Sequence, residues 1–587
     1  MVGHLERWRG YSFLITGLWL AIITSVAYSA YGFSVGILLT WLASLFLTGA
    51  HFFRSRTKVA SNFQWKDFYV GLALLLIFAP AYLLFLYQVP SEVNTDEIAV
   101  MVTAERATIN NLPDLFSLSD YFAFPSLEFI VLGWSGRMLG GVNLLNMRIV
   151  HALLGLGIVV LTYIFFRVFT SRIYAVGGAM LVSSNHALMA TSRMAIRNDW
   201  ALLLEIGALS LLLLGLKRRC PFYSFLGGAV VGLSFYFYFP GRFTIVLWLV
   251  VLGLIAVFFK RQLPLALLGK LAAISLLGSL LVAAPLGVST LKDADSASSY
   301  GREQLLIFPE GRDLQQAWTG VPGISEGEAI KRNVLKGIAT FNSDLRDEGN
   351  IYFNSGHGFV DPLTGVLIWL GFIGIVLKAR KREEDILGLG GFLFLWLLFS
   401  LFITKNPNYT RLIVILPFVA FLVVEALKDI STAIGKLGRN VFRHADKVAF
   451  GVGIFIIVAW NLAIFGDYVK TGLDKGDVVG GTGRYIEDRK GIPDYSFYLA
   501  ANNEYPYYDW GGPGHWKDWM GFFTGDSQEV KVLLPGDLER GVKERNFTIF
   551  MSQKLWDQSE ETLIRLYPAL QEHNIKPDGS LLAVEVN

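Results

Sequence analysis

The chain has 587 residues, of which 53% are apolar, 14% aromatic and only 17% charged. Because soluble domains carry roughly 25% charged residues, this deficit excludes a string of ordinary soluble domains. The aliphatic and aromatic content excludes intrinsic disorder, and the single cysteine, Cys220, excludes a disulfide framework. The net charge of +3 is too small and too dispersed for a nucleic-acid-binding protein. The composition therefore indicates a polytopic membrane protein.

Apolar segments long enough to cross a bilayer follow one another along most of the chain. A spanning helix needs about 20 mostly apolar residues. About thirteen segments meet this condition, at 11–30, 33–53, 68–88, 148–166, 173–192, 200–216, 222–238, 243–259, 265–288, 363–377, 386–404, 411–427 and 447–466. The first is too long, and too closely followed by a second, for a cleaved signal peptide. We expect these spans to be clean of charge.

Lysine and arginine residues distinguish the two sides of the predicted membrane. The short loops on one side carry about 22 of them and those on the other about five, and the sides alternate correctly through every span. Basic loops stay in the cytoplasm, so we predict a plasma-membrane protein with a cytoplasmic N-terminus and an outer C-terminus. The five outer residues are Arg193, Arg197, Arg242, Lys405 and Arg411.

Three large hydrophilic pieces fall on the predicted outer side, at about 89–147, 289–362 and 467–587. No comparable piece faces the cytoplasm, and no convincing G-x-x-x-x-G-K-[ST] motif is found. Both observations argue against an ATP-driven machine, which needs a nucleotide site on the cytoplasmic side.

The outer tail, 467–587, alternates strand-like and helical stretches. We predict a helix near Glu560–His573 and strands at Tyr495–Ala501, Val530–Leu534, Phe547–Met551 and Leu581–Val586. This pattern indicates a small α/β domain. The tail also holds a run of aromatic residues. One interpretation is a surface that stacks on sugar rings. The alternative, which we favour, is a domain core together with aromatic residues that rest on the membrane surface. The residues of this run are Tyr505, Tyr507, Tyr508, Trp510, Trp516, Trp519, Phe522 and Phe523.

Two adjacent carboxylates, Asp96 and Glu97, follow the third predicted span at the outer lip of the membrane. Adjacent carboxylates repel each other, so one has a raised pKa or both share a cation. Either state suits a base that accepts a proton from a hydroxyl. The alternative is structural: Thr95 or Asp96 caps the start of a helix.

A second outer cluster lies between the fifth and sixth spans and contains Arg193, Arg197 and Asp199. Arginines in a short outer loop need a compensating anion, and the guanidinium fork matches phosphate oxygens. An internal salt bridge from Arg197 to Asp199, with Trp200 as an interfacial anchor, explains the cluster equally well.

Arg242, Lys405 and Arg411 add three more cations on the same side. Each alone could be a snorkelling side chain at a helix end. Together with the carboxylates, they have the composition of a site that binds an anionic lipid headgroup and deprotonates a nucleophile.

Six sequence elements occur in a fixed order on this outer side. They are Asp96-Glu97, Pro125 in Ala123–Leu127, Asn146–Gly155, Asn185-His186 through Asp199, Tyr236–Arg242, and Asn408–Arg411 through Pro417. In this order they resemble the GT-C glycosyltransferases, in the family 39-like branch that contains protein O-mannosyltransferases and aminoarabinose lipid A transferases. Two extra spans precede the part that resembles this family.

The resemblance implies an all-α, GT-C-like transmembrane catalytic domain at 68–466, preceded by two extra helices in 1–67 and followed by the extracytoplasmic α/β domain at 467–587. It implies an inverting transfer of sugar from a polyprenyl-phosphate-linked donor to a hydroxyl of a lipid, polysaccharide or protein acceptor. No nucleotide is required, because the activated lipid supplies the energy.

The resemblance also assigns roles to residues. Asp96 would be the catalytic base, and Glu97 and Asp199 would orient the acceptor or share a divalent cation. Asp96 and Asp199 are the candidate ligands if Mg²⁺ or Mn²⁺ is used. The donor phosphate would be bound by Arg148, Arg193, Arg197, Arg242, Lys405 and Arg411.

Two other classes of protein remain as alternatives. A secondary transporter or lipid flippase also needs many spans and a few buried charges, but usually places them near the bilayer midplane in two repeated halves. A non-enzymatic envelope scaffold would leave the converging charges unexplained.

Overall fold

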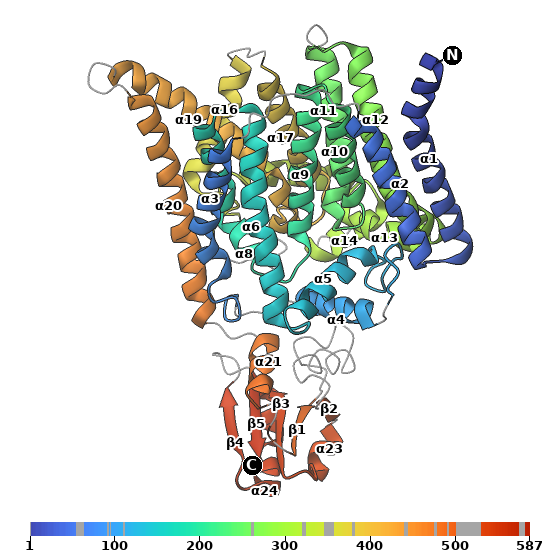
Figure 1. The fold of residues 1–587 in the computed structure, drawn as a ribbon. Coiled ribbons are helices and arrows are strands. Elements are labelled where there is room, and N and C mark those ends of the chain that lie inside the picture. Colours follow the sequence, from blue (N-terminus) through green and yellow to red (C-terminus); the bar gives the residue numbers. More distant parts are fainter. Residues whose placement is uncertain are drawn as a thin grey trace.

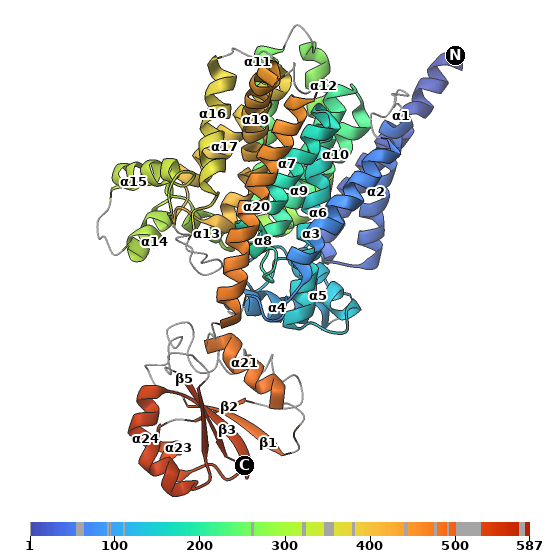
Figure 2. The same cartoon turned by 90° about the vertical axis from the view of Figure 1, so that its left-hand side faces the viewer.

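The computed structural model describes most of the chain, namely residues 2–54, 64–90, 93, 95–109, 112–259, 263–319, 325–345, 357–377, 382–438, 444–474, 478–489, 492, 494–500, 530–533, 535–574 and 581–586. Ten of the described helices are long and apolar enough to cross a membrane. They form one bundle, and a small sheet domain lies beyond one of its ends (Figures 1 and 2). We call this end of the bundle the domain end and the opposite end the far end. The predicted fold class is confirmed.

The bundle is built from helices of very different length. Its helices are α1 (Val2–Tyr31), α2 (Val35–Arg54), α3 (Trp65–Leu83), α6 (Leu144–Phe169), α7 (Arg172–Ser184), α8 (His186–Thr191), α9 (Asn198–Lys217), α10 (Pro221–Ser234), α11 (Thr244–Phe258), α12 (Leu265–Lys292), α16 (Pro362–Leu377), α17 (Glu383–Leu401), α19 (Leu416–Gly438) and α20 (Ala445–Asp474). Short turns precede two of them: η1 (Phe239–Phe243) before α11, and α18 (Tyr409–Leu412) with η2 (Ile413–Ile415) before α19.

The predicted outer loops fold into short helices at the domain end. The first loop contains α4 (Thr95–Ile109) and α5 (Ser126–Met138), and the second contains α13 (Ala294–Gln304), α14 (Pro309–Thr319) and α15 (Glu326–Ala339). In both views α4 and α5 lie at the end of the bundle that faces the sheet domain, and in Figure 2 α13, α14 and α15 extend beside the bundle.

Three predicted spans correspond to shorter helices, namely α7 and the apolar helices α10 and α16. The span expected at 173–192 is interrupted, because α7 ends at Ser184 and α8 begins at His186. The Asn185 side chain explains the break: its Oδ1 accepts a hydrogen bond from the Leu188 backbone amide at 3.0 Å and caps the new helix.

The expectation that the spans are clean of charge is wrong. Glu205 lies in the middle of α9 and is only 1% exposed, so a carboxylate is buried inside a spanning helix. Glu425 of α19 is also buried, but it pairs with Arg382 at 2.8 Å and with Lys428. A run of leucines keeps the average hydropathy of α9 high, which conceals a single carboxylate in a 20-residue window.

The sheet domain is a five-stranded mixed sheet of order β2-β1-β3-β5-β4. Its elements are α21 (Val478–Arg489), β1 (Tyr495–Ala500), β2 (Val530–Leu533), α23 (Pro535–Arg540), β3 (Asn546–Ser552), α24 (Gln553–Leu566), β4 (Gln571–Asn574) and β5 (Leu581–Val586). Strand β1 is parallel to β2 and β3, whereas β5 is antiparallel to β3 and β4. Alternating apolar residues bury both faces, one under α21 and the other under α23 and α24.

The four predicted strands of this domain are confirmed, but its helix begins earlier than predicted. The Ser552 hydroxyl caps α24 by accepting from the Leu555 amide at 3.2 Å, so the helix occupies Gln553–Leu566. The end of the predicted helix is strand β4, whose polar sequence shows no apolar alternation because it is an exposed edge strand. The aromatic run from Tyr505 to Phe523 lies outside the described residues.

Helices α10 and α12 pack with their backbones in direct contact. A Cβ atom added at Gly278 of α12 would lie 2.4 Å from the Phe225 carbonyl oxygen of α10. Gly269, in the same helix, has no atom within 4 Å of that position. Small residues allow this close approach, which helices in lipid use instead of the hydrophobic effect.

We therefore predict that Gly278→Ala lowers the thermal midpoint of the purified protein, because overpacking costs about 1–3 kcal/mol. Gly269→Ala is the matched control, and it is neutral or slightly stabilising because alanine favours a helix. The measurement is thermal unfolding of both variants in the same detergent. Equal midpoints for the two variants would contradict the close contact.

Candidate active site at the domain end

The predicted carboxylate and several predicted cations meet where five segments converge at the domain end. These segments are the N-terminus of α4, the stretch 121–129 leading into α5, the loop 192–197, η1, and the loop from Lys405 into α18. Segments more than 300 residues apart in the sequence thus contribute to one site.

Asp96 lies in the first turn of α4 and accepts a hydrogen bond from the Tyr121 hydroxyl at 2.8 Å. A helix N-terminus favours a negative charge there. Burial nevertheless raises the pKa of Asp96 above its ordinary value, although Arg197, Lys405 and Arg411 oppose this effect. The carboxylate is therefore a stronger base than a solvent-exposed aspartate and has three cations within electrostatic range.

Arg197 is held by aromatic rings rather than by a carboxylate. Its guanidinium carbon lies 3.8 Å from the ring centre of Phe124 and 5.0 and 5.1 Å from those of Tyr121 and Tyr238. The side chain is buried, and its Nη1 makes no hydrogen bond with the described residues. Rings that stabilise a cation without using its N–H groups leave those groups free to bind an anion.

Arg411 and Lys405 come from a later part of the chain, the loop that leads into α18 and α18 itself. The Arg411 guanidinium donates to Gln304 Oε1 at 2.5 Å and to the Tyr300 hydroxyl at 3.4 Å. The Lys405 backbone amide donates to Gln315 Oε1 at 2.9 Å, and desolvation lowers the pKa of the Lys405 ammonium. Helices α13 and α14 therefore hold these two cations close to Asp96.

Sequence reasoning missed Glu128, which the structure places in the same cluster. Glu128 is fully buried in α5, and neither of its oxygens makes a hydrogen bond with the described residues. Burial raises the pKa of Glu128 to about 8, while Arg197 and Arg242 oppose the shift. The sequence did contain a signal for Glu128. It is a single carboxylate in the apolar run after Pro125, at a position where the buried face of an amphipathic helix usually carries leucine or isoleucine.

Glu97 and Arg148 form a buried ion pair with each other. Arg148 Nη2 lies 2.9 Å from Glu97 Oε2, and both side chains are fully buried. Arg148 also donates to the carbonyl oxygens of Leu86 and Pro90, and Glu97 Oε1 accepts from the Ala195 amide at 2.7 Å. The pair thus joins α4, α6, the chain after α3 and the loop that carries Arg197.

Arg193 binds backbone at the end of α3. It donates to the carbonyl oxygens of Ala81 at 2.7 Å and Leu84 at 2.6 Å. These carbonyls are among those that a helix C-terminus leaves without partners. Arg193 is therefore tied to α3 rather than grouped with Arg197 and Arg411.

Asp199 is buried in the first turn of α9, beside Ser192. Its carboxylate oxygens make no hydrogen bond of good geometry with the described residues, and no ion pair joins it to Arg197 there. The internal Arg197–Asp199 salt bridge considered from the sequence is thus not formed.

Among the described residues, no three His, Cys, Asp or Glu side chains are grouped as they would be to hold a metal ion. Asp96 has a tyrosine and three cations as neighbours, while Asp199 has Ser192 and Tyr82. This cationic setting does not fit a shared Mg²⁺ or Mn²⁺ site, and we derive no step through a metal.

We predict that Glu97→Gln strongly destabilises the protein. Removing one partner of a buried pair leaves an uncompensated charge, at a cost of about 3–5 kcal/mol. The matched control is Glu310→Gln, because Glu310 pairs with Arg302 at the surface and contributes at most about 1 kcal/mol. The readout is the thermal midpoint without substrate; equal effects of the two substitutions would contradict a structural role for Glu97.

Comparison with known proteins identifies the fold. No protein-family model and no curated protein sequence matches the chain. Solved structures do match it at low identity. The apo oligosaccharyltransferase of Archaeoglobus fulgidus is 13% identical, with 85% of this chain and 71% of that chain covered and a TM-score of 0.50. ArnT of Cupriavidus metallidurans, solved with undecaprenyl phosphate, is 12% identical over 88% of this chain and 97% of that chain, with a TM-score of 0.49.

A partial match, 17% identical over 41% of this chain and 34% of that chain with a TM-score of 0.31, is the S. cerevisiae protein O-mannosyltransferase complex bound to the sugar donor. At such identities a likeness concerns the fold. The Archaeoglobus structure shares its fold with this chain over most of both, and the predicted GT-C fold is confirmed.

Proposed function

We propose that the protein is an inverting glycosyltransferase that moves a sugar from a polyprenyl-phosphate-linked donor to an acceptor hydroxyl. The observation that carries this proposal is the position of Asp96, a carboxylate of raised pKa surrounded by Arg197, Lys405 and Arg411. A base beside a group of cations suits a reaction that removes a proton from one substrate and releases a phosphate from the other. The GT-C-like fold agrees with this reaction class.

The proposed reaction is a single displacement. The Asp96 carboxylate takes the proton of the acceptor hydroxyl, whose oxygen then forms a bond with the anomeric carbon of the sugar. The bond from that carbon to the phosphate oxygen breaks on the opposite face, and its electron pair leaves with polyprenyl phosphate. The anomeric configuration is therefore inverted.

The leaving phosphate gains negative charge as this bond breaks. Arg197, whose Nη1 is buried without a hydrogen-bond partner among the described residues, is the first candidate to bind it. Arg411, Lys405 and Arg242 are the other candidates, because the cluster around Asp96 and Glu128 contains all three. Preorganised cations in a site of low dielectric stabilise the developing charge without reorganisation.

The remaining predicted residues receive positioning roles in this proposal. Glu97 and Arg148 hold α4, and therefore Asp96, at its place, and Arg193 holds the loop that leads to Arg197. Asp199 is proposed to orient the acceptor, because it is a buried carboxylate whose oxygens have no hydrogen-bond partner among the described residues.

The proposed site lies on the outer face of the plasma membrane. The distribution of lysine and arginine supports this orientation, since the described basic residues at the far end include Arg54, Arg167, Arg172, Lys217 and Lys428. The sheet domain then lies outside the cytoplasm, at the same end of the bundle as the site. A lipid, polysaccharide or protein acceptor would reach the site from this side.

The direct test uses purified protein and a panel of radiolabelled polyprenyl-phosphate monosaccharides. We predict that one donor releases polyprenyl phosphate, with its sugar passed to water or to an added membrane extract. Asp96→Asn is expected to retain donor binding but to lose about 10²–10⁴-fold in turnover, the usual contribution of a general base. Glu105→Gln, an exposed carboxylate on the same helix, is the control and is expected to keep full turnover.

If no donor in the panel is consumed and the wild-type protein instead moves labelled lipid across liposomes, the enzyme proposal fails and a lipid transporter replaces it. If Asp96→Asn turns over as fast as the wild type, the assignment of the base fails.

The electrostatic environment of Asp96 predicts a defined pH dependence. The base works only when deprotonated, so kcat/KM falls as the pH drops through the raised pKa of Asp96. Lys405 lowers that pKa, so Lys405→Met should raise it further and move the acid limb to higher pH by up to about one unit. Lys405→Arg keeps the charge and should leave the limb in place. The measurement is kcat/KM against pH; a limb that moves equally in both variants would contradict the electrostatic role.

A further inference from the structure

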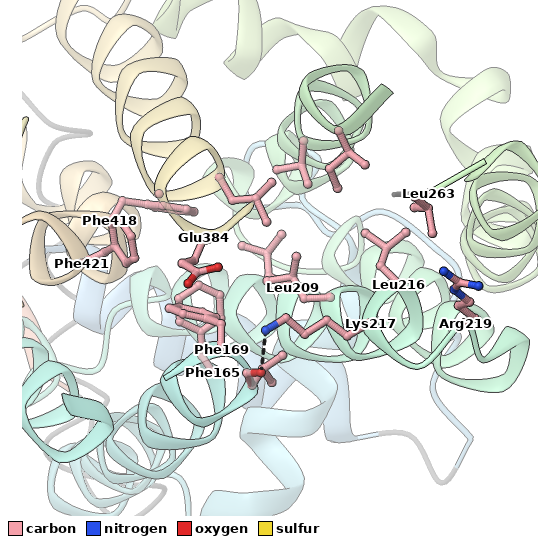
Figure 3. Close-up of a pocket in the computed structure, with 16 residues that line it drawn as sticks. Phe165, Phe169, Leu209, Leu216, Lys217, Arg219, Leu263, Glu384, Phe418 and Phe421 are labelled. Atoms are coloured by element: carbon pink, nitrogen blue, oxygen red, sulfur yellow. Dashed lines mark hydrogen bonds between the residues drawn. The ribbon is translucent and has the colours of Figure 1, made fainter. Parts of the chain in front are cut away.

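A second cavity lies near the far end of the bundle, away from the site around Asp96. Helices α6, α9, α11, α17 and α19 enclose it, and its volume is about 190 Å³. Figure 3 shows its lining, with phenylalanines on one side and leucines on the other. The reaction proposed above uses none of these residues.

The wall of the cavity is apolar. Of the sixteen residues that line it, thirteen are apolar or glycine, and the aromatic rings come from Phe165, Phe169, Phe418 and Phe421. Such a space between spanning helices favours a hydrocarbon chain over water, because most of its wall offers water no hydrogen-bond partner.

The three charged residues of the lining lie where helices end. Lys217 is the last residue of α9, is exposed, and donates to the Val168 carbonyl oxygen at 3.2 Å. Arg219, also exposed, follows two residues later. Glu384, near the start of α17, lies 3.8 Å from the Arg382 guanidinium, which also pairs with Asp385 and Glu425 at 2.8 Å. The cavity therefore reaches the surface at two cations.

We propose that this cavity binds an anionic phospholipid. One acyl chain occupies the apolar space, and the positive potential of Lys217 and Arg219 attracts the anionic headgroup. The charges and the apolar wall complement the two parts of such a lipid, and basic pockets between spanning helices are typical binding sites for anionic headgroups. A zwitterionic lipid such as phosphatidylcholine gains little from the two cations, because its own choline cation offsets the charge of its phosphate. The proposal depends on the membrane fold and not on the proposed reaction.

The test measures binding of phosphatidylglycerol and phosphatidylcholine, each carrying a spin label on one acyl chain, to the full-length protein in detergent. The wild type is expected to prefer the anionic lipid. Lys217→Ala with Arg219→Ala should weaken binding of phosphatidylglycerol about 30-fold, at about 1 kcal/mol for each cation, and leave phosphatidylcholine unchanged.

Arg218→Ala is the matched control. It removes one positive charge from the position between Lys217 and Arg219, but Arg218 does not line the cavity, and its guanidinium lies 5.8 Å from the Tyr223 ring instead. This variant should retain the preference. Leu213→Trp keeps every charge and fills the cavity, so it should weaken binding of the labelled chain and tests the proposal even if the double variant does not fold.

The proposal would be overturned if the wild type bound the two lipids equally or if Leu213→Trp left binding unchanged. It would also be overturned if Arg218→Ala weakened binding of phosphatidylglycerol as much as the double variant does. Displacement of the labelled lipid by stoichiometric polyprenyl phosphate would also overturn it, because the cavity would then be a donor-lipid site.

Discussion

The arrangement of the domain end depends on the buried ion pair between Glu97 and Arg148. Neither charge is in contact with water, so each needs the other, and their remaining hydrogen bonds reach two further backbone segments, the chain after α3 and the loop 192–197. Asp96 is the neighbour of Glu97 in the sequence and cannot move independently of it. A structural pair that is expensive to break therefore determines where the proposed base lies.

This arrangement also separates two kinds of arginine. Arg148 and Arg193 donate to oxygens that the fold itself must satisfy, a carboxylate and the carbonyls at the end of α3. Arg197 is stabilised by aromatic faces instead, which leave Nη1 without a partner among the described residues. A cation held in this way is prepared for an anionic ligand, because binding it breaks no internal hydrogen bond.

The two ends of the bundle differ in chemistry. At the domain end, carboxylates and cations are buried together, and there we propose that proton removal and phosphate release take place. At the far end, an apolar cavity meets two exposed cations, which suits an amphiphile. Helices α6 and α9 contribute to both ends, with Arg148 and Asp199 at the domain end and Phe165 and Leu213 at the far-end cavity.

The sequence alone determined the membrane class, most helix positions, the four main strands of the tail and the fold, because apolar periodicity and motif order are local properties of the chain. It could not assign partners to charges. The salt bridge considered between Arg197 and Asp199 is not formed, and Glu128 was not singled out, because the charges that meet lie far apart in the sequence, 51 residues in the case of Glu97 and Arg148. Only the tertiary structure showed that Glu97 neutralises Arg148 while Asp96 faces Arg197, Lys405 and Arg411. The physical reason is that a buried charge has no water to solvate it and therefore needs a partner in the protein. The packing of distant helices determines which charges meet.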